Sequence, residues 1–344
     1  MNSTGLMKYA GALVAIAMCS ACAGGSAGAG GSAGAPSTAS FNATHVGKTL
    51  WVNGRPVTAA RLNPSPTYAT IVPDRSAKHF FEYVISFYQT YASIFNYPKS
   101  NKMIGQLDGA GGQGCTNVLY GYGKKIIWNA GRTNNVITEY KVPGNKVLKT
   151  LPLDYSVTSS CAMNNSGDLA VGVLLGNSYS AGGQVVIFKN ATGSGKVYVT
   201  PLVEEYFNGY DGQGNLFADG FTNSNFGLVE LPKGSNTFQT ITTSNTVEFP
   251  GSVQWDGTYL TVFDQETNEV YQYTVSGTQA TLKGTVTLSG AGDCAQTWIV
   301  KGLIYCGDAG NNNGSVYAYP AGGSPLAVFT GSFDTPLGVV AAKR

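Results

Sequence analysis

The stretch SVYAYPAGGSPLAVF, residues 315–329, holds a short strand that ends near Tyr319, a turn of Pro, Gly and Ser, and a second β-rich strand. The pattern also occurs in SIFNYPKSNKMIGQL (93–107), ITEYKVPGNKVLKTL (137–151), VVIFKNATGSGKVYVTPL (185–202), LVELPKGSNTFQTI (228–241) and VYQYTVSGTQATLKGTV (270–286). The matching positions, separated by 43, 48, 43, 42 and 46 residues, are Tyr97, Tyr140, Phe188, Leu231, Tyr273 and Tyr319. A strand-rich period of about 40 to 50 residues predicts an all-β β-propeller with one blade per repeat.

A hairpin precedes the aromatic strand of each repeat, because turn signals separate alternating apolar runs. Examples are MNNSGDLAVG (163–172), YDGQGNLFADG (210–220), QWDGTYLTVFD (254–264) and WIVKGLIYCGD (298–308). Each blade is therefore predicted to have four strands, which are an inner strand, a return strand, the aromatic strand and an outer edge strand.

The last blade is predicted to be split between the two ends of the propeller. The tail LGVVAAKR (337–344) has the pattern of an inner strand, and residues 80–107 have the pattern of the three strands that this blade lacks. Their pairing would close the ring and remove open sheet edges, which promote aggregation. We therefore expect a six-bladed propeller over residues 80–344, closed by one C-terminal and three N-terminal strands.

The N-terminus has the features of an export signal. A basic residue, Lys8, precedes the short apolar run AGALVAIAM, which is too short to span a bilayer stably. Residues 1–22 end in Cys19-Ser20-Ala21-Cys22, which resembles a bacterial lipoprotein box with Cys22 as the lipidated residue, although Cys19 stands where Leu is usual. The alternative is ordinary cleavage after Ala21-Cys22-Ala23.

Two segments separate this signal from the predicted propeller. Residues 23–40 consist almost wholly of Gly, Ser and Ala, a composition typical of a flexible tether. Residues 41–79 contain several prolines, and we expect an irregular segment packed on the propeller. A lipid on Cys22 would place the protein at the bacterial cell envelope, tethered to a membrane.

The composition narrows the classes of partner. Charged residues make up 12% of the chain, about half the usual share, and the net charge is only +2. Nucleic-acid binding needs a clustered basic face, so no nucleic-acid partner is expected. We expect a monomer with a neutral polar surface, which is typical of exported β-proteins.

The repeats resemble the NHL-repeat and gluconolactonase-like group of six-bladed propellers. The resemblance is carried by GNLFAD (214–219) and by DAGNNNGSVYAYPAG (308–322), and it covers residues 80–344. It implies the fold and leaves the activity open, because this fold serves lyases, lactonases, quinoproteins and binding proteins. No metal-site residue of the gluconolactonase-like enzymes is carried over to this chain.

Histidine and acidic residues bear on metal chemistry. The chain has only two histidines, His45 and His79, too few for a multi-histidine metal site. Four carbonyl-type residues fall near the ends of the second strands, where their oxygens could bind Ca²⁺. They are Asn129, Asp219, Asp264 and Asp308. The alternative is that each caps its own Gly- or Asn-rich turn.

Four cysteines lie in the predicted propeller, an even number that suggests disulfides in an exported chain. Cys294 and Cys306 flank a turn on neighbouring antiparallel strands. Cys115 and Cys161 are 46 residues apart, about one period, so they occupy the same inner-strand position on adjacent blades. We predict the pairs Cys294–Cys306 and Cys115–Cys161, with buried free thiols as the alternative.

Several tyrosines are expected at inner-strand ends or loops, where aromatic rings with Asn and Asp suit carbohydrate or peptide binding. They are Tyr120, Tyr122, Tyr155, Tyr179, Tyr206 and Tyr210. The alternative is that these rings serve blade packing. Two functions remain, a non-catalytic binding or scaffold propeller without a cofactor, and a Ca²⁺-dependent lactonase or hydrolase of the gluconolactonase-like kind.

Overall fold

The computed structural model divides the chain into two compact units, residues 1–64 and 65–344. It describes residues 43–46, 49–52, 55–57, 80–86, 91–97, 102–108, 113–116, 126–130, 136–141, 146–153, 158–174, 182–223, 225–331, 333 and 335–343. The predicted signal, Cys22 and the tether lie outside these residues. No helix among the described residues is long and apolar enough to cross a membrane.

The first unit contains a small antiparallel meander. Its strands are β1 (Ala43–Val46), β2 (Thr49–Val52) and β3 (Arg55–Val57), in the order β1-β2-β3. Val46 pairs with Thr49 and Val52 pairs with Arg55. Part of the segment 41–79, expected to be irregular, is therefore regular sheet, whereas its predicted packing on the propeller stays a prediction.

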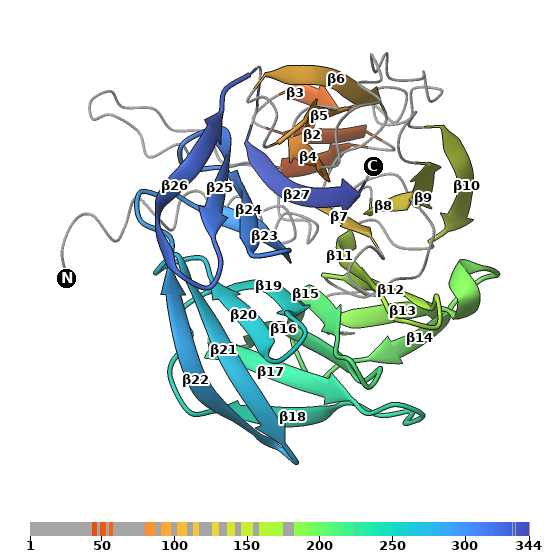
Figure 1. Cartoon of the computed structure of the whole chain (residues 1–344). Coiled ribbons are helices and arrows are strands. Elements are labelled where there is room, and N and C mark those ends of the chain that lie inside the picture. The colour runs from red at the N-terminus through yellow and green to blue at the C-terminus, as the bar shows by residue number, and fades with distance from the viewer. Residues whose placement is uncertain are drawn as a thin grey trace, which may run out of the picture. The chain divides into compact units, whose positions relative to one another are not determined.

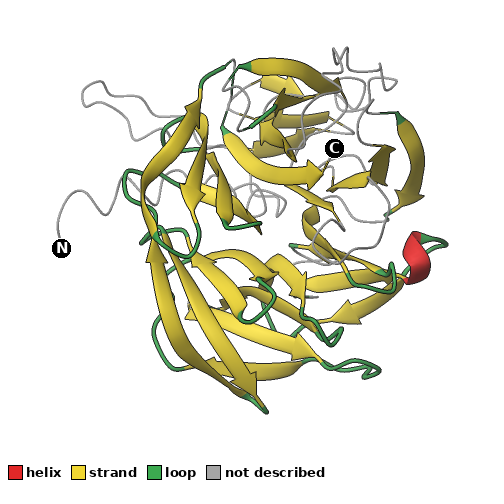
Figure 2. Ribbon diagram, viewed as in Figure 1, coloured by secondary structure: helices red, strands yellow, loops and turns green. Residues whose placement is uncertain are grey.

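The second unit is built from antiparallel groups of four strands (Figures 1 and 2). The first two groups along the chain are β7 (Gln113–Thr116), β8 (Ile126–Ala130), β9 (Val136–Lys141) and β10 (Val147–Pro152), then β11 (Thr158–Met163), β12 (Leu169–Val173), β13 (Gln184–Phe188) and β14 (Lys196–Val199). The next two are β15 (Glu204–Tyr210), β16 (Leu216–Thr222), β17 (Asn225–Leu231) and β18 (Gln239–Thr243), then β19 (Pro250–Trp255), β20 (Leu260–Asp264), β21 (Glu269–Ser276) and β22 (Gln279–Thr287). A short 3-10 helix, Lys189–Ala191, follows β13.

The last two groups hold the C-terminal part of the chain. One consists of β23 (Cys294–Val300), β24 (Leu303–Asp308), β25 (Asn313–Ala318) and β26 (Gly322–Phe329). The other consists of β27 (Pro336–Lys343), β4 (Phe80–Ser86), β5 (Tyr91–Phe95) and β6 (Met103–Asp108). The strands β27 and β4 are antiparallel neighbours, so this sheet joins one C-terminal strand to three N-terminal strands, as the sequence predicts.

The first strand of each group faces the centre of the second unit (Figure 1). Each contacts the next in the cyclic order β7, β11, β15, β19, β23, β27 and back to β7. The outer strands β18 and β22 also pair in parallel, which merges two groups into one eight-stranded sheet. This arrangement is that of an all-β propeller.

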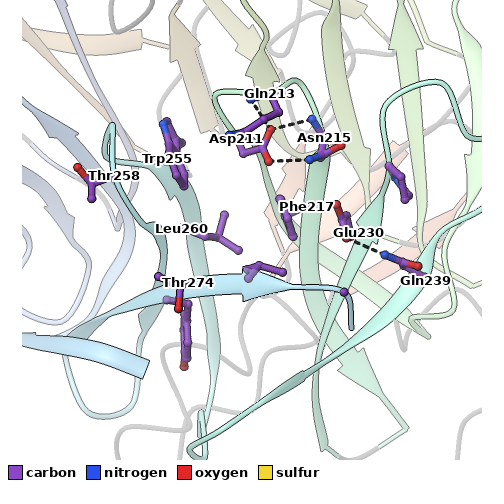
Figure 3. A pocket seen from close by; sticks show the side chains of 14 residues that line it. Asp211, Gln213, Asn215, Phe217, Glu230, Gln239, Trp255, Thr258, Leu260 and Thr274 are labelled. Atoms are coloured by element: carbon purple, nitrogen blue, oxygen red, sulfur yellow. Dashed lines mark hydrogen bonds between the residues drawn. The ribbon is translucent and has the colours of Figure 1, made fainter. Parts of the chain in front are cut away.

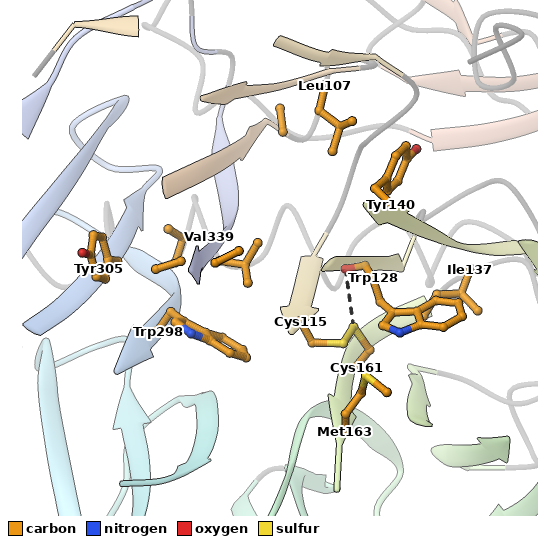
Figure 4. Packing of buried hydrophobic residues seen from close by; sticks show 14 of the residues in the cluster. Leu107, Cys115, Trp128, Ile137, Tyr140, Cys161, Met163, Trp298, Tyr305 and Val339 are labelled. Atoms are coloured by element: carbon orange, nitrogen blue, oxygen red, sulfur yellow. Dashed lines mark hydrogen bonds between the residues drawn. A yellow bond between two sulfur atoms is a disulfide. The ribbon is translucent and has the colours of Figure 1, made fainter. Parts of the chain in front are cut away.

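The repeated aromatic positions explain how neighbouring sheets pack. Each lies in the third strand of its group or within two residues of its end, and Tyr140, Phe188 and Tyr273 are buried. Tyr97 packs edge-on against Tyr305 and Phe329, with ring centroids 6.3 and 6.0 Å apart. The large buried rings fill the spaces between sheets (Figure 4), where apolar burial stabilises the fold by about 25 cal/mol per Å².

Polar side chains on the first strands bond to the backbone of the next first strand. Gln254 on β19 accepts from the Ile299 N–H and donates to the Ile299 carbonyl, both at 2.8 Å. Gln296 on β23 accepts from the Val339 N–H at 3.0 Å, across to β27. Buried polar groups must be paired, so these bonds explain why the innermost strands are polar and yet buried.

Both predicted disulfides are present. Cys115 on β7 and Cys161 on β11 bridge two neighbouring first strands, with Cα atoms 5.6 Å apart (Figure 4). Cys294 and Cys306 bridge β23 and β24, with Cα atoms 5.5 Å apart. The latter two do not face each other directly, because Cys294 pairs with Asp308 beside a β-bulge.

Candidate functional site

Three of the predicted metal ligands share one structural setting. Asp264 and Asp308 end β20 and β24 as predicted, whereas Asp219 lies in the middle of β16, and all three are buried. Each pairs with a first-strand residue at which the register shifts, which marks a β-bulge. A bulge leaves backbone N–H groups without ladder partners, so an acceptor is needed at this position.

The carboxylates of Asp264 and Asp308 accept from backbone N–H groups in the segments just before the paired first strands. Asp264 accepts from the N–H groups of Glu248 and Phe249, at 2.7 and 3.2 Å. Asp308 accepts in the same way from Gly292 and Asp293, both at 3.0 Å.

The third carboxylate also links two first strands. Asp219 accepts from the Phe207 N–H at 3.0 Å and from the Gly251 N–H at 3.2 Å, and Gly251 lies on the next first strand, β19. Asp264 and Asp308 also accept from N–H groups of the turns that follow them, those of Glu266 at 3.0 Å and Asn311 at 2.9 Å, which agrees with the turn-capping alternative for these two residues. Asp219 links strands and does not cap its own turn. Asn129 lies on β8 opposite Gly114, and its side chain is outside the described structure.

The predicted ligands are not gathered into one metal-binding group within the described residues. One set of three has ligand spacing there, formed by Cys294, Cys306 and Asp308. Its two sulfur atoms are joined in the disulfide, so they cannot act as thiolate ligands. The predicted Ca²⁺ site stays a prediction.

A second polar cluster was not predicted. Glu205 on β15 is fully buried and accepts from Ser159, and its other oxygen accepts from Asn208 at 3.1 Å. Burial raises the pKa of the Glu205 carboxyl to about 7, although the hydrogen bonds from Ser159, Asn208 and Ser160 oppose that rise. The cluster lies between β11 and β15, away from solvent.

A large pocket opens between the β15–β18 and β19–β22 halves of the eight-stranded sheet, with a volume of about 450 Å³. We call it the tryptophan pocket. Its floor is formed by the buried side chains of Phe217, Leu260 and Tyr273. Trp255, which is half-buried, and Glu230 lie on opposite sides of this floor (Figure 3).

The turn between β15 and β16 places two polar groups in the tryptophan pocket. Asp211 accepts from the backbone N–H groups of Gln213 and Asn215, at 2.9 and 2.8 Å, which folds the turn. Gly214 has φ = +90°, a conformation that glycine adopts readily. The Asn215 amide donates to Asp211 at 2.8 Å (Figure 3), so both side chains are fixed in place.

Glu230 and Gln239 supply the opposite wall. The Gln239 amide donates to the Glu230 carboxylate at 2.8 Å. Burial raises the pKa of Glu230, the bond from Gln239 lowers it, and the charge of Asp211 raises it further. The tryptophan pocket thus combines an aromatic side, an apolar floor and ordered hydrogen-bonding groups.

The predicted tyrosines have mixed positions. Tyr206 is buried in ring packing with Phe221 and Phe249, at centroid distances of 5.4 and 5.8 Å, as the packing alternative holds. Tyr210 is buried and lines a second pocket. Outside the described residues lie Tyr120, Tyr122, Tyr155, Tyr179 and His79, and the side chain of His45.

The main residues of the tryptophan pocket are not among the predicted site residues. Asp211, Asn215 and Trp255 fall in YDGQGN and QWDGTY, which were interpreted only as turn signals. Glu230 directly precedes the repeat position Leu231, but nothing in the sequence indicates that it and Trp255 line one pocket from the two halves of the eight-stranded sheet. An acidic residue or a tryptophan where a first strand meets its turn is the sequence signal that points to this pocket.

Comparison with known proteins supports the fold and leaves the function open. No protein-family model and no curated protein sequence matches this chain. The nidogen β-propeller in the crystal structure of the nidogen/laminin complex has a TM-score of 0.57 and 13% identity, covering 76% of this chain and 98% of its own. A protein of unknown function from Bacteroides caccae has a TM-score of 0.55 and 11% identity, covering 77% of this chain and 100% of its own.

Proposed function

We propose that this protein is a non-catalytic binding or scaffold propeller of six blades, displayed at the bacterial cell envelope. The lipobox-like Cys22 and the tether of residues 23–40 support the envelope location. The six first strands in cyclic contact support the blade number. The tryptophan pocket is the proposed binding site, and its proposed ligand is a carbohydrate.

One observation carries the choice of carbohydrate. At the next junction, between β19–β22 and β23–β26, the Tyr319 hydroxyl donates to the Asp256 carboxylate and accepts from the Gln272 amide at 2.8 Å. Asp256 directly follows its first strand as Asp211 does, and Gln272 precedes its repeat residue as Glu230 does. A hydroxyl group of the protein itself thus fills this polar position.

In the tryptophan pocket the equivalent position is open to a ligand. The equivalent tyrosine, Tyr273, directs its hydroxyl to Asn245 at 2.7 Å instead. Asp211 and Glu230 therefore line the cavity without a tyrosine hydroxyl between them. A hydroxyl-rich ligand could donate to these carboxylates, and a sugar ring could lie against Trp255, since aromatic faces bind apolar ring surfaces.

The size of the pocket agrees with a small polar ligand. Its 450 Å³ falls within the range of about 300 to 1,000 Å³ that is usual for ligand sites. The acidic side chains Asp211 and Glu230 are the charged groups in the described lining, so an anionic sugar would be repelled. The proposed ligand is accordingly neutral.

A glycan-binding screen of the full-length protein tests the proposal, with calorimetry on the compounds that bind. We expect a neutral carbohydrate to bind, and Trp255→Ala to weaken its binding by tenfold or more. Thr240→Ala, at an exposed residue of β18 outside the pocket, is the control and should bind as wild type. Failure of every glycan to bind, or unchanged binding in Trp255→Ala, would contradict the proposal.

A thermal-shift experiment distinguishes the lactonase alternative from the proposed binding function. A ligand that binds only the native state raises the melting temperature. A rise with Ca²⁺ that EDTA reverses would favour the metal-dependent enzyme, and the proposed binding function predicts no such dependence.

A further inference from the structure

A second pocket lies beside the tryptophan pocket. It has a volume of about 370 Å³ and opens between β11–β14 and β15–β18. We call it the tyrosine pocket, because Tyr198 and Tyr210 line it. Gln213 and Pro232 line both pockets, so the two hollows are neighbours on the two sides of the β15–β18 group.

A low ridge separates the two pockets. It consists of the turn 211–215 and the turn that begins at Pro232. Asn215 fixes one turn to the other, because its side-chain oxygen accepts from the Lys233 N–H at 2.9 Å while its amide donates to Asp211 at 2.8 Å. Gln213 at the top of the ridge is exposed, so the ridge offers a polar surface on which a ligand can cross.

Leu231 explains why the tyrosine pocket is open. This residue occupies the repeat position held by Tyr319 at the closed junction, and it lines the tyrosine pocket. A leucine carries no hydroxyl that could reach the facing turn, residues 164–168, as Tyr319 reaches Asp256. The two junctions whose repeat positions hold Leu231 and Tyr273 therefore contain open pockets. At the junction next to them, the hydroxyl of Tyr319 fills the corresponding position.

The tyrosine pocket is also ordered. The Lys196 ammonium lies 4.6 Å from the centre of the Tyr198 ring and donates to Asn236 at 2.6 Å. Asn236 and Tyr198 line the pocket from two different sheets. Tyr198 is half-buried, so part of its ring remains available to a sugar.

From these features we infer that the ligand is a carbohydrate chain and not a single sugar. It lies across both pockets, with one unit against Trp255, one against Tyr198, and the intervening part over Gln213 and Pro232. The inference rests on the proposed function and adds the class of ligand, a neutral oligosaccharide. Linked units bind more tightly than separate ones, because the second contact becomes intramolecular.

A chain-length series tests this inference on the full-length protein. The probes are neutral oligomers of glucose, mannose and N-acetylglucosamine, each from one to six units, measured by calorimetry. For the series that binds, we expect affinity to rise at least tenfold from one unit to about five and then to level off. Tyr198→Ala should remove most of that rise and leave binding of the single sugar unchanged.

Control variants separate the contact from the fold. Tyr198→Phe keeps the ring and should retain the rise, whereas Trp255→Ala should weaken binding at every length. Equal affinity for one and six units, or a rise that survives Tyr198→Ala, would overturn the inference and leave the proposed function standing. Failure of all three series to bind the wild-type protein would overturn both.

Discussion

Glu205 is a buried carboxyl in a polar cluster between two first strands, and it should make stability depend on pH. Burial raises its pKa to about 7 in the folded protein, whereas an unfolded glutamate titrates near its ordinary value of 4.5. The folded state therefore holds this proton more tightly. The protonated Glu205 carboxyl contributes its full stabilisation of the fold below about pH 4.5, and this stabilisation is lost as the pH rises to about 7.

The measurement is the free energy of unfolding of wild type and Glu205→Gln in urea at pH 5 and pH 8. Glutamine keeps an acceptor for Asn208 and carries no ionisable proton. We expect wild type to lose up to about 3 kcal/mol between these pH values and the variant to lose clearly less. Equal losses would show that Glu205 is not the titrating group.

At the scale of elements, the two disulfides differ in the length of chain that they close. The bridge between β7 and β11 closes 46 residues, and the bridge between β23 and β24 closes 12. In the chain-entropy model these loops correspond to about 4 and about 3 kcal/mol. The double variant Cys115→Ser/Cys161→Ser should therefore be destabilised more than Cys294→Ser/Cys306→Ser.

Chemical unfolding of the two double variants against wild type measures both losses, and thiol counting confirms that the remaining bridge has formed. The reverse order of stability would contradict the loop-length argument. It would indicate that the bulge beside Cys294, rather than chain entropy, decides how much each bridge contributes.

The elements that could be predicted from the sequence are those fixed by spacing within a repeat. Cys115 and Cys161 lie one period apart, so their pairing follows from the repeat alone. The pairing of β27 with β4 follows from the same count. The strands between Ala43 and Val57 were not predicted, because they are three or four residues long and contain Pro56.

The site was less predictable than the fold, for a physical reason. The sequence predicts Asp219 near a strand end, but the structure places it in the middle of β16, and the Phe207 N–H that it accepts from lies at a bulge in the paired strand. Trp255 and Glu230 approach each other through the packing of two four-stranded groups. No periodicity within one repeat encodes a contact of that kind.

At the scale of the whole molecule, stability depends on the sheet that contains both ends of the propeller unit. β27 pairs along its length with β4, and it also contacts the first strands β7 and β23. Val339, Val340, Ala341 and Ala342 are fully buried. Deleting residues 337–344 would expose the edge of β4 and open the ring, so burial and backbone pairing would be lost together.

We expect this deletion to lower the melting temperature by more than 10 °C or to leave the protein insoluble, because a loss of several kcal/mol is a large part of a domain's stability. Deleting eight residues of the tether, 26–33, is the matched control and should leave the melting temperature unchanged. Differential scanning fluorimetry on both full-length variants decides the outcome. A near-unchanged melting temperature in the C-terminal deletion would mean that the ring does not depend on its closing strand, and it would contradict the proposed role of β27 in the sixth blade.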